Sequence, residues 1–189
     1  MTRIRLHHTQ VSRGNGPGVR FTVWTQGCGL ACPGCFNEPT HPAGGGFMVD
    51  VPDLAKQIMD QPNIDGVTIS GGEPLDQADA IFALLEQVSL SSPRLTWVLY
   101  TGYTHKEILA NPERTRVVAA VDLTLAGRYQ RAASHPYLRK RIITSSNRVD
   151  PGYFSARRTA EWTISGGMVT MTGIQGPNKK TTETSCRIE

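Results

Sequence analysis

Residues 66–89 read GVTISGGEPLDQADAIFALLEQVS. The segment Gly66–Ser70 is short and rich in β-branched residues, which is typical of a buried strand. It runs directly into the turn Gly71-Gly72-Glu73-Pro74, and from Asp76 to about Ser89 apolar residues recur at helical spacing. A strand, a tight turn and an amphipathic helix form one unit of an α/β fold. This stretch therefore predicts a mostly parallel sheet covered by helices.

The same alternation continues on either side of this unit. We expect one helix that contains Leu54–Met59 and another that begins with the capping box Thr104-His105-Lys106-Glu107. We expect further strands at 19–25, 95–101 and 117–125, and a C-terminal β-hairpin that joins 162–164 to 168–171 through Gly166-Gly167. No repeat and no second domain is evident, so the sequence predicts one α/β domain over residues 1–189.

The composition is that of an ordinary globular chain, with 189 residues, 39% hydrophobic, 19% charged, 19 Gly and 12 Pro. These values exclude a disordered, collagen-like or coiled-coil protein. No apolar run approaches the roughly 20 residues that span a bilayer, and no apolar segment follows the charges of Met1–Arg5. We therefore expect a cytoplasmic protein without a membrane partner. The net charge is +4, and the basic run Arg139-Lys140-Arg141 lacks interleaved aromatic residues, so we interpret it as a solvated rim rather than a nucleic-acid surface.

Three of the four cysteines lie within eight residues, as Cys28, Cys32 and Cys35 in the pattern C-x3-C-x2-C. In a reducing compartment such clustering indicates metal ligation rather than disulfides. Two sites suit this spacing: an iron–sulfur cluster held by three thiolates, and a structural zinc site with His41 as the fourth ligand. The fourth cysteine, Cys186, lies in the polar tail and is interpreted as an incidental thiol.

The turn Gly71-Gly72-Glu73-Pro74 favours the cluster over zinc. It follows a predicted parallel strand, and open α/β sheets bind their ligands at the carboxyl ends of such strands. The two glycines allow a close backbone approach, and Pro74 stiffens the turn. An ordinary strand-to-helix turn explains this motif taken singly. The cysteine motif at the end of the preceding strand makes a shared ligand site the better interpretation.

Together the two motifs resemble the hallmark of the radical S-adenosylmethionine superfamily. The resemblance covers about residues 14–150 and implies a partial parallel β/α barrel, with residues 151–189 as a C-terminal hairpin and tail. It implies one [4Fe-4S] cluster on Cys28, Cys32 and Cys35, whose open iron binds S-adenosylmethionine, and it places Gly71, Gly72, Glu73 and Pro74 against that cofactor. Reductive cleavage of the cofactor would release a 5′-deoxyadenosyl radical that abstracts hydrogen from the substrate.

Within the superfamily, the chain is similar to the short activating enzymes of glycyl-radical proteins, in particular those of anaerobic ribonucleotide reductase. The similar segments are Gly34-Cys35-Phe36-Asn37, Gly14–Arg20, Tyr100–Thr104, Asp122–Tyr129 and Ser145–Arg148. The chain departs from the usual pattern at Asn15 and Ala126, where acidic residues are common, and lacks a Gln after Asn147. The resemblance adds six residues to the expected cofactor site: Phe36, Asn37, Thr101, Asp122, Ser146 and Asn147.

The resemblance implies an activating enzyme that installs a glycyl radical on a large partner protein. Such an enzyme needs a one-electron reductant, for example flavodoxin or ferredoxin. Two alternatives stay open: a radical enzyme that modifies a peptide or small molecule, and a non-catalytic module that binds zinc or a cluster.

Overall fold

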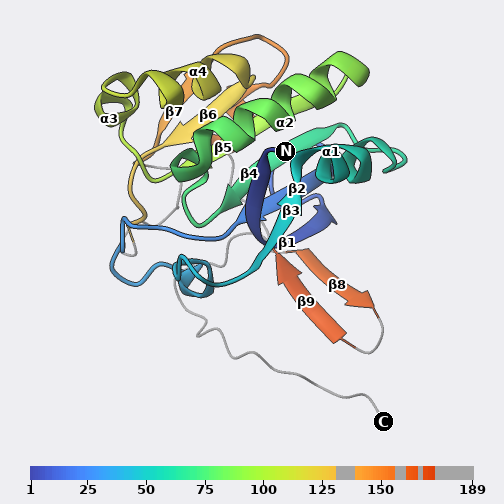
Figure 1. The fold of residues 1–189 in the computed structure, drawn as a ribbon, viewed down its shortest axis with the longest axis horizontal. Helices are drawn as coiled ribbons and strands as arrows, with labels where there is room; N and C mark the ends of the chain where they lie inside the picture. The colour runs from blue at the N-terminus through green and yellow to red at the C-terminus, as the bar shows by residue number, and fades with distance from the viewer. Residues whose placement is uncertain (131–138, 156–160, 166–167, 173–189) are drawn as a thin grey trace.

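A mixed sheet of seven strands organises the chain, and helices cover one of its faces (Figure 1). The structure is a computed structural model that describes residues 1–130, 139–155, 161–165 and 168–172. The strands of the sheet are β1 (Arg3–Ser12), β2 (Arg20–Thr25), β3 (Phe47–Asp50), β4 (Gly66–Gly71), β5 (Thr96–Thr101), β6 (Leu123–Ala126) and β7 (Arg141–Thr144). The α-helices are α1 (Val51–Met59), α2 (Ala78–Ser91), α3 (His105–Leu109) and α4 (Pro112–Ala120), and the 3-10 helices are η1 (Glu38–Thr40), η2 (Pro74–Gln77) and η3 (Pro151–Ser155).

The centre of the sheet is parallel and its margins are antiparallel. The strand order is β3-β1-β2-β4-β5-β6-β7, and the four strands from β2 to β6 run in one direction. Thr25 pairs with Gly71 at the carboxyl ends of β2 and β4, and Thr101 pairs with Ala126 at those of β5 and β6. The loops that follow these four strands therefore leave the same edge of the sheet.

Alternate residues of the central strands pack against the helices. Phe21 and Val23 of β2 and Trp97 and Leu99 of β5 share one hydrophobic core with Leu54, Ile58, Ile81, Leu84 and Val88 of the helices. The opposite face of β5 and β6 carries a smaller core, in which Val98, Leu123 and Leu125 pack with Val149 and Phe154. Both faces of these strands are buried, which explains why they read as continuous apolar runs.

The structure confirms the predicted strands at 19–25, 66–70 and 95–101 to within a residue or two, and the capping box at Thr104. The strand predicted at 117–125 is wrong, because residues up to Ala120 belong to α4 and only Leu123–Ala126 form β6. Asn111 starts that helix by accepting a hydrogen bond from the backbone N–H of Arg114 at 2.9 Å. This cap and the packing of α4 on α2 outweigh the strand preference of Val117 and Val118.

For three strands of the main sheet, β1, β3 and β7, no bounds were predicted. β1 and β3 lie side by side at one margin of the sheet, where antiparallel pairing needs no crossover helix to mark it in the sequence. Beyond the main sheet, β8 (Glu161–Ser165) and β9 (Met168–Thr172) pair antiparallel, while the predicted turn at 166–167 and the tail lie outside the described residues. Within the described segments, no helix is both long and apolar enough to cross a membrane.

Candidate functional site

The three clustered cysteines lie on one loop that leaves the carboxyl end of β2. Backbone hydrogen bonds hold both ends of the loop together: the N–H of Gly27 donates to the carbonyl of Thr40 at 2.8 Å, and that of Cys28 donates to the carbonyl of His41 at 3.1 Å. A third bond, from the N–H of Cys35 to the carbonyl of Cys32 at 3.2 Å, closes a turn inside the loop. The loop is therefore a fixed platform for its side chains.

The thiols on this loop are free and half-buried. Burial raises the pKa of both the Cys28 and the Cys35 thiol, and the charges of Cys32 and Cys28 raise that of Cys35 further. Backbone N–H groups of the loop oppose these shifts, those of Leu30 and Ala31 at Cys28 and that of Asn37 at Cys35. Thiols that are grouped, partly shielded from water and met by N–H donors have the chemistry that a thiolate-ligated cluster requires.

The backbone of the loop adopts conformations that most residues avoid. Ala31 has a φ of 45°, and Gly34 has a φ of 65°. Ala31 directly precedes Cys32, and Gly34 directly precedes Cys35. Left-handed backbone at a non-glycine residue is typical of sites where function over-determines the local conformation.

Among the described residues, no three His, Cys, Asp or Glu side chains are grouped so that they could hold a metal ion. His41, the fourth zinc ligand considered above, contributes its backbone carbonyl to the loop closure. Three thiolates that share one loop match the close spacing that wraps a compact iron–sulfur cluster.

The Gly-Gly pair at the end of β4 packs directly on the start of the cysteine loop. The N–H of Gly72 donates to the carbonyl of Thr25, and the N–H of Glu73 donates to the carbonyl of Gly27, both at 2.8 Å. A Cβ on Gly72 would lie 2.2 Å from the Gly27 carbonyl oxygen, and Gly71 has a φ of 108°. The two glycines are therefore required for contact between the two motifs.

Glu73 is fully buried and joins the ends of β4 and β5. Its carboxylate accepts hydrogen bonds from the hydroxyl of Thr101 at 2.7 Å, the N–H of Gly102 at 2.7 Å and the N–H of Leu75 at 3.0 Å. Burial raises the pKa of Glu73, and these three donors lower it. A carboxylate satisfied in this way fixes the geometry of the strand ends.

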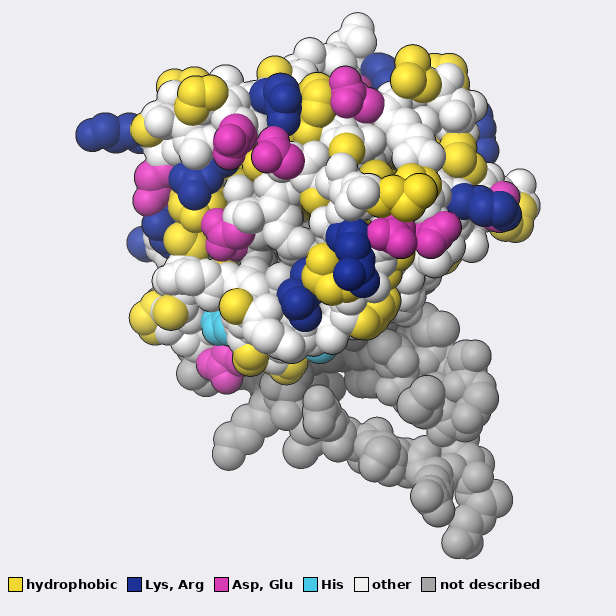
Figure 2. Space-filling model, viewed as in Figure 1, with side chains coloured by type: hydrophobic (Ala, Val, Ile, Leu, Met, Phe, Trp, Pro, Cys, Tyr) yellow, Lys and Arg dark blue, Asp and Glu magenta, His cyan; other side chains and the backbone are white. Residues whose placement is uncertain are grey.

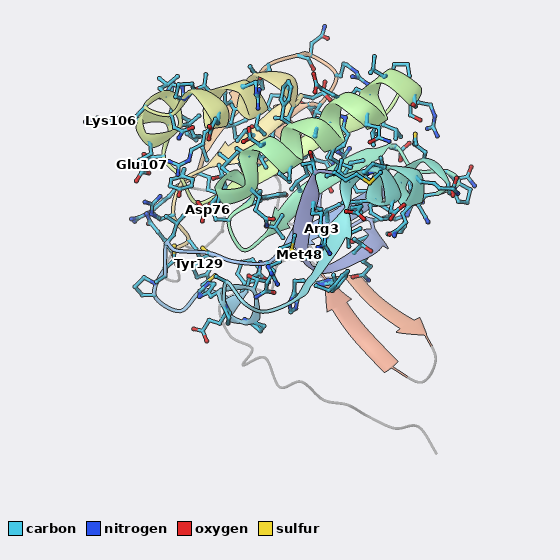
Figure 3. The ribbon with its side chains drawn as sticks, in the orientation of Figure 1. Arg3, Met48, Asp76, Lys106, Glu107 and Tyr129 are labelled. Carbon is cyan, nitrogen blue, oxygen red and sulfur yellow. The ribbon has the colours of Figure 1, made fainter. Side chains whose placement is uncertain are left out.

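Other residues expected at the site come together at this edge of the sheet. The Asn37 side chain donates to the carbonyl of Gly71 at 3.4 Å, and Pro74 is buried at the start of η2. Phe36 is 62% exposed and meets the ring of Tyr129 edge-on, with 5.3 Å between ring centroids. In Figure 3, Tyr129, Asp76 and Glu107 lie on one side of the molecule, where the loops after β4, β5 and β6 emerge.

Asp122, Ser146 and Asn147 lie at the other end of the strands, which corrects the expectation that they belong to the cofactor site. Asp122 precedes β6, where its carboxylate accepts from the N–H of Trp97 at 2.7 Å and from the Ser146 hydroxyl at 2.6 Å. Because β7 runs antiparallel to β6, residues that follow Thr144 return to the amino end of β6. Asp122 and Ser146 therefore stabilise the edge of the sheet that is remote from the cysteine loop, and Asn147 lies exposed at that edge.

The structure adds two basic residues that the sequence did not indicate. Arg128 donates to both carboxylate oxygens of Glu107, at 2.7 Å and 3.0 Å, and also to the carbonyl of Gly102. Lys140 donates to the carbonyls of Thr101 and Gly127. Lys140 was interpreted as part of a solvated rim because the basic run lacks interleaved aromatic residues. In the structure Arg139 and Arg141 are exposed while Lys140 is half-buried, and no local pattern in the sequence distinguishes it from them.

Charges of both signs alternate over the molecular face seen in Figure 2, without a broad region of one sign.

Comparison with known proteins matches the described site and fold to one family. Residues 14–149 match the family model of the 4Fe-4S single cluster domain. An anaerobic ribonucleoside-triphosphate reductase-activating protein from Salmonella typhi is 30% identical over 130 residues, which cover 66% of this chain and 83% of the relative. The protein of the same name from Escherichia coli K12 has the same identity and coverage, and that from Enterobacteria phage T4 is 31% identical over 122 residues, covering 62% of this chain and 75% of the relative.

Among solved structures, QueE from Escherichia coli shares 17% identity at a TM-score of 0.43, over 55% of this chain and 54% of that one, a likeness too weak to support an argument. The sequence relatives and the family model cover both the cysteine loop and the strand ends that meet it. The chain therefore belongs to the 4Fe-4S single cluster domain family and to the group of anaerobic ribonucleoside-triphosphate reductase-activating proteins.

Proposed function

We propose that this chain installs a glycyl radical on an anaerobic ribonucleoside-triphosphate reductase, using a [4Fe-4S] cluster held by Cys28, Cys32 and Cys35. The observation that carries the proposal is the direct bonding of Gly72 and Glu73 to Thr25 and Gly27, which joins the thiol loop and the end of β4 into one site. The names of its relatives support the choice of partner.

Each part of the chain has a separate task in this proposal. The three thiolates hold the cluster and leave one iron position open, because the loop supplies no fourth cysteine. Gly71, Gly72 and the backbone beside Pro74 present a surface free of side chains to the cofactor. When bound, the cluster and S-adenosylmethionine supply a reductive cleavage whose product radical removes a hydrogen atom from the partner's glycine.

The fold suits a protein substrate. We propose that β2, β4, β5 and β6 form one side of a partial parallel β/α barrel in a single domain, with the helices outside. η3 and Val149 already cover the inner face of β5 and β6, so the chain leaves little room for an enclosed small substrate. A protein partner that supplies its glycine on an extended segment closes the open side. Flavodoxin or ferredoxin is the expected class of reductant.

The test begins with anaerobic reconstitution with iron and sulfide. The wild-type chain, reduced with dithionite, should hold four irons per chain and form 5′-deoxyadenosine from S-adenosylmethionine. Cys32→Ala should lose both properties. Cys186→Ala is the matched control, because it removes a cysteine outside the proposed ligand set, and it should retain both. A full cluster without 5′-deoxyadenosine would overturn the radical chemistry.

The partner requires its own experiment. The reconstituted chain is mixed with an anaerobic ribonucleoside-triphosphate reductase from the same organism that carries α-deuterated glycine. A glycyl-radical signal in electron paramagnetic resonance and deuterium in the 5′-deoxyadenosine are the expected results. Active cleavage without either signal would refute this partner and favour the peptide or small-molecule alternative.

A further inference from the structure

Lys140 places an ammonium group at the carboxyl ends of two central strands. It directly precedes β7, and its Nζ donates to the carbonyl of Thr101, the last residue of β5, at 3.4 Å. It also donates to the carbonyl of Gly127, which follows β6. The group is therefore fixed by backbone at the same edge of the sheet as the cysteine loop.

The ammonium has no carboxylate partner among the residues that the structure describes. The other basic residue at this edge, Arg128, is neutralised by Glu107 in a two-bond ion pair. Burial lowers the pKa of Lys140, negative charges on Glu73, Cys32 and Cys35 raise it, and Arg128 lowers it. A half-buried cation that meets only carbonyl groups loses part of its hydration, and an anionic group nearby would compensate for that loss.

A short series of contacts links Lys140 to the cysteine loop. Lys140 donates to the Thr101 carbonyl, and the Thr101 hydroxyl donates to Glu73 at 2.7 Å. The Leu30 side chain lies against Gly102, where a Cβ would come within 2.4 Å of it. Leu30 stands between two of the ligand cysteines in the sequence. Lys140 thus contacts the same strand end on which the thiol loop rests.

We propose that Lys140 is a positioning residue that provides the counter-charge for the thiolate ligands and raises the reduction potential of the cluster. This inference rests on the proposed cluster. The thiolates bring several negative charges to one edge of the sheet, and reduction adds another. A fixed positive charge favours the more negative, reduced state, and net charge near a cluster is one of the factors that set its potential. In a site of low dielectric constant this effect is much larger than in water.

The test separates the charge of Lys140 from its hydrogen bonds. Lys140→Gln removes the charge and keeps N–H donors for the two carbonyls, Lys140→Met removes both, and Lys140→Arg keeps the charge. Arg139→Gln is the matched control, because Arg139 is an exposed neighbour whose side chain donates to Gln130 at 3.0 Å. The midpoint potential of each reconstituted protein is measured by redox titration without S-adenosylmethionine or partner.

The expected result is a more negative potential in Lys140→Gln and Lys140→Met, with Lys140→Arg and Arg139→Gln at the wild-type value. The inference is overturned if Lys140→Gln has the wild-type potential, or if Arg139→Gln shifts as much. Because Gln retains donors, the melting temperature of the metal-free Lys140→Gln protein should stay near wild type, which a purely structural role would not predict. If Lys140→Met fails to fold, the midpoint potentials of Lys140→Gln and Lys140→Arg still test the inference. A wild-type chain that binds no cluster would refute the proposed function, whereas an intact cluster whose potential ignores Lys140 refutes only this inference.

Discussion

Replacing Thr101 by Val removes one hydroxyl from the junction of β4 and β5 and leaves the shape of the side chain unchanged. The hydroxyl donates to Glu73 at 2.7 Å and accepts from the N–H of Tyr103 at 3.0 Å. Thr101 is 2% exposed and Glu73 is fully buried, so water does not replace either bond readily. The variant therefore leaves a buried carboxylate with two donors in place of three.

The expected loss of stability in Thr101→Val depends on the charge of the acceptor, the Glu73 carboxylate. A hydrogen bond to an ionised group contributes about 1.5–3 kcal/mol, and the freed N–H adds a smaller loss, so we expect destabilisation of about 2–3 kcal/mol. For a chain of this size that corresponds to a fall in melting temperature of about 5–10 °C. Because both side chains are β-branched, strand propensity changes little.

Thr124→Val is the matched control. Thr124 is also fully buried in a central strand, but its hydroxyl has no hydrogen-bond partner among the described residues. Replacing an unsatisfied hydroxyl by a methyl group should leave stability unchanged or increase it slightly. Urea unfolding of the metal-free proteins, followed by circular dichroism, measures both variants. Equal losses for the two variants, or a loss below about 0.5 kcal/mol for Thr101→Val, would refute the role given to this bond.

Three further predictions use other features of the site. Gly72→Ala should prevent incorporation of iron, because the added Cβ would lie 2.2 Å from the backbone carbonyl oxygen of Gly27. The control Gly29→Ala should incorporate iron normally, because no atom lies within 4 Å of the added Cβ. Equal iron contents in the two variants would contradict the packing argument. Ala31→Gly should stabilise the metal-free protein by up to about 1 kcal/mol in urea unfolding, because glycine adopts a φ of 45° without strain, and a destabilised variant would show that the strain is absent. His8 is an exposed residue of β1, but one face of its ring stacks on Trp24. This partial shielding from water first and His7 second lower its pKa from 6.5 to about 4, so the unfolded chain binds its proton before the folded chain does. Stability should consequently fall as pH decreases from about 6.5 to about 4, and His8→Phe should flatten this part of the profile in urea titrations at several pH values.

Most of the fold was predictable because its signals are local. The strand and helix of residues 66–89 follow from side-chain periodicity, and the Thr104 capping box follows from a four-residue pattern that the structure confirms. The strand prediction for residues 117–125 was wrong for a physical reason as well. Val117 and Val118 favour strand by propensity, but an Asn111 cap and the surface of α2 offer a helix better packing than a strand would have.

Some residues of the candidate site were predictable from local sequence patterns, and others were not. The thiol triad and the Gly-Gly turn are short motifs, and the sequence predicted both and their adjacency, since parallel strands end at one edge of a sheet. Asp122 was misplaced because it directly precedes β6, so it lies at the amino end of that strand, whereas the cysteine loop lies at the carboxyl ends of the parallel strands. A motif carried over by resemblance does not indicate which end of a strand a flanking residue occupies.

The alternation of strand-like and helix-like segments was sufficient to predict the α/β class, and the spacing of cysteines and glycines was sufficient to predict a candidate ligand site, because each depends on residues close together in the chain. The chemistry expected at that site came from the family resemblance of these motifs. The bond from Thr101 to Glu73 spans 28 residues, and that from Lys140 to Thr101 spans 39. These hydrogen bonds form only when the carboxyl ends of β4, β5 and β6 lie side by side in the folded sheet. Folding therefore decides which carboxylate is buried and which cation of the described residues meets backbone carbonyls and no carboxylate, because burial and electrostatic range are properties of distance in space.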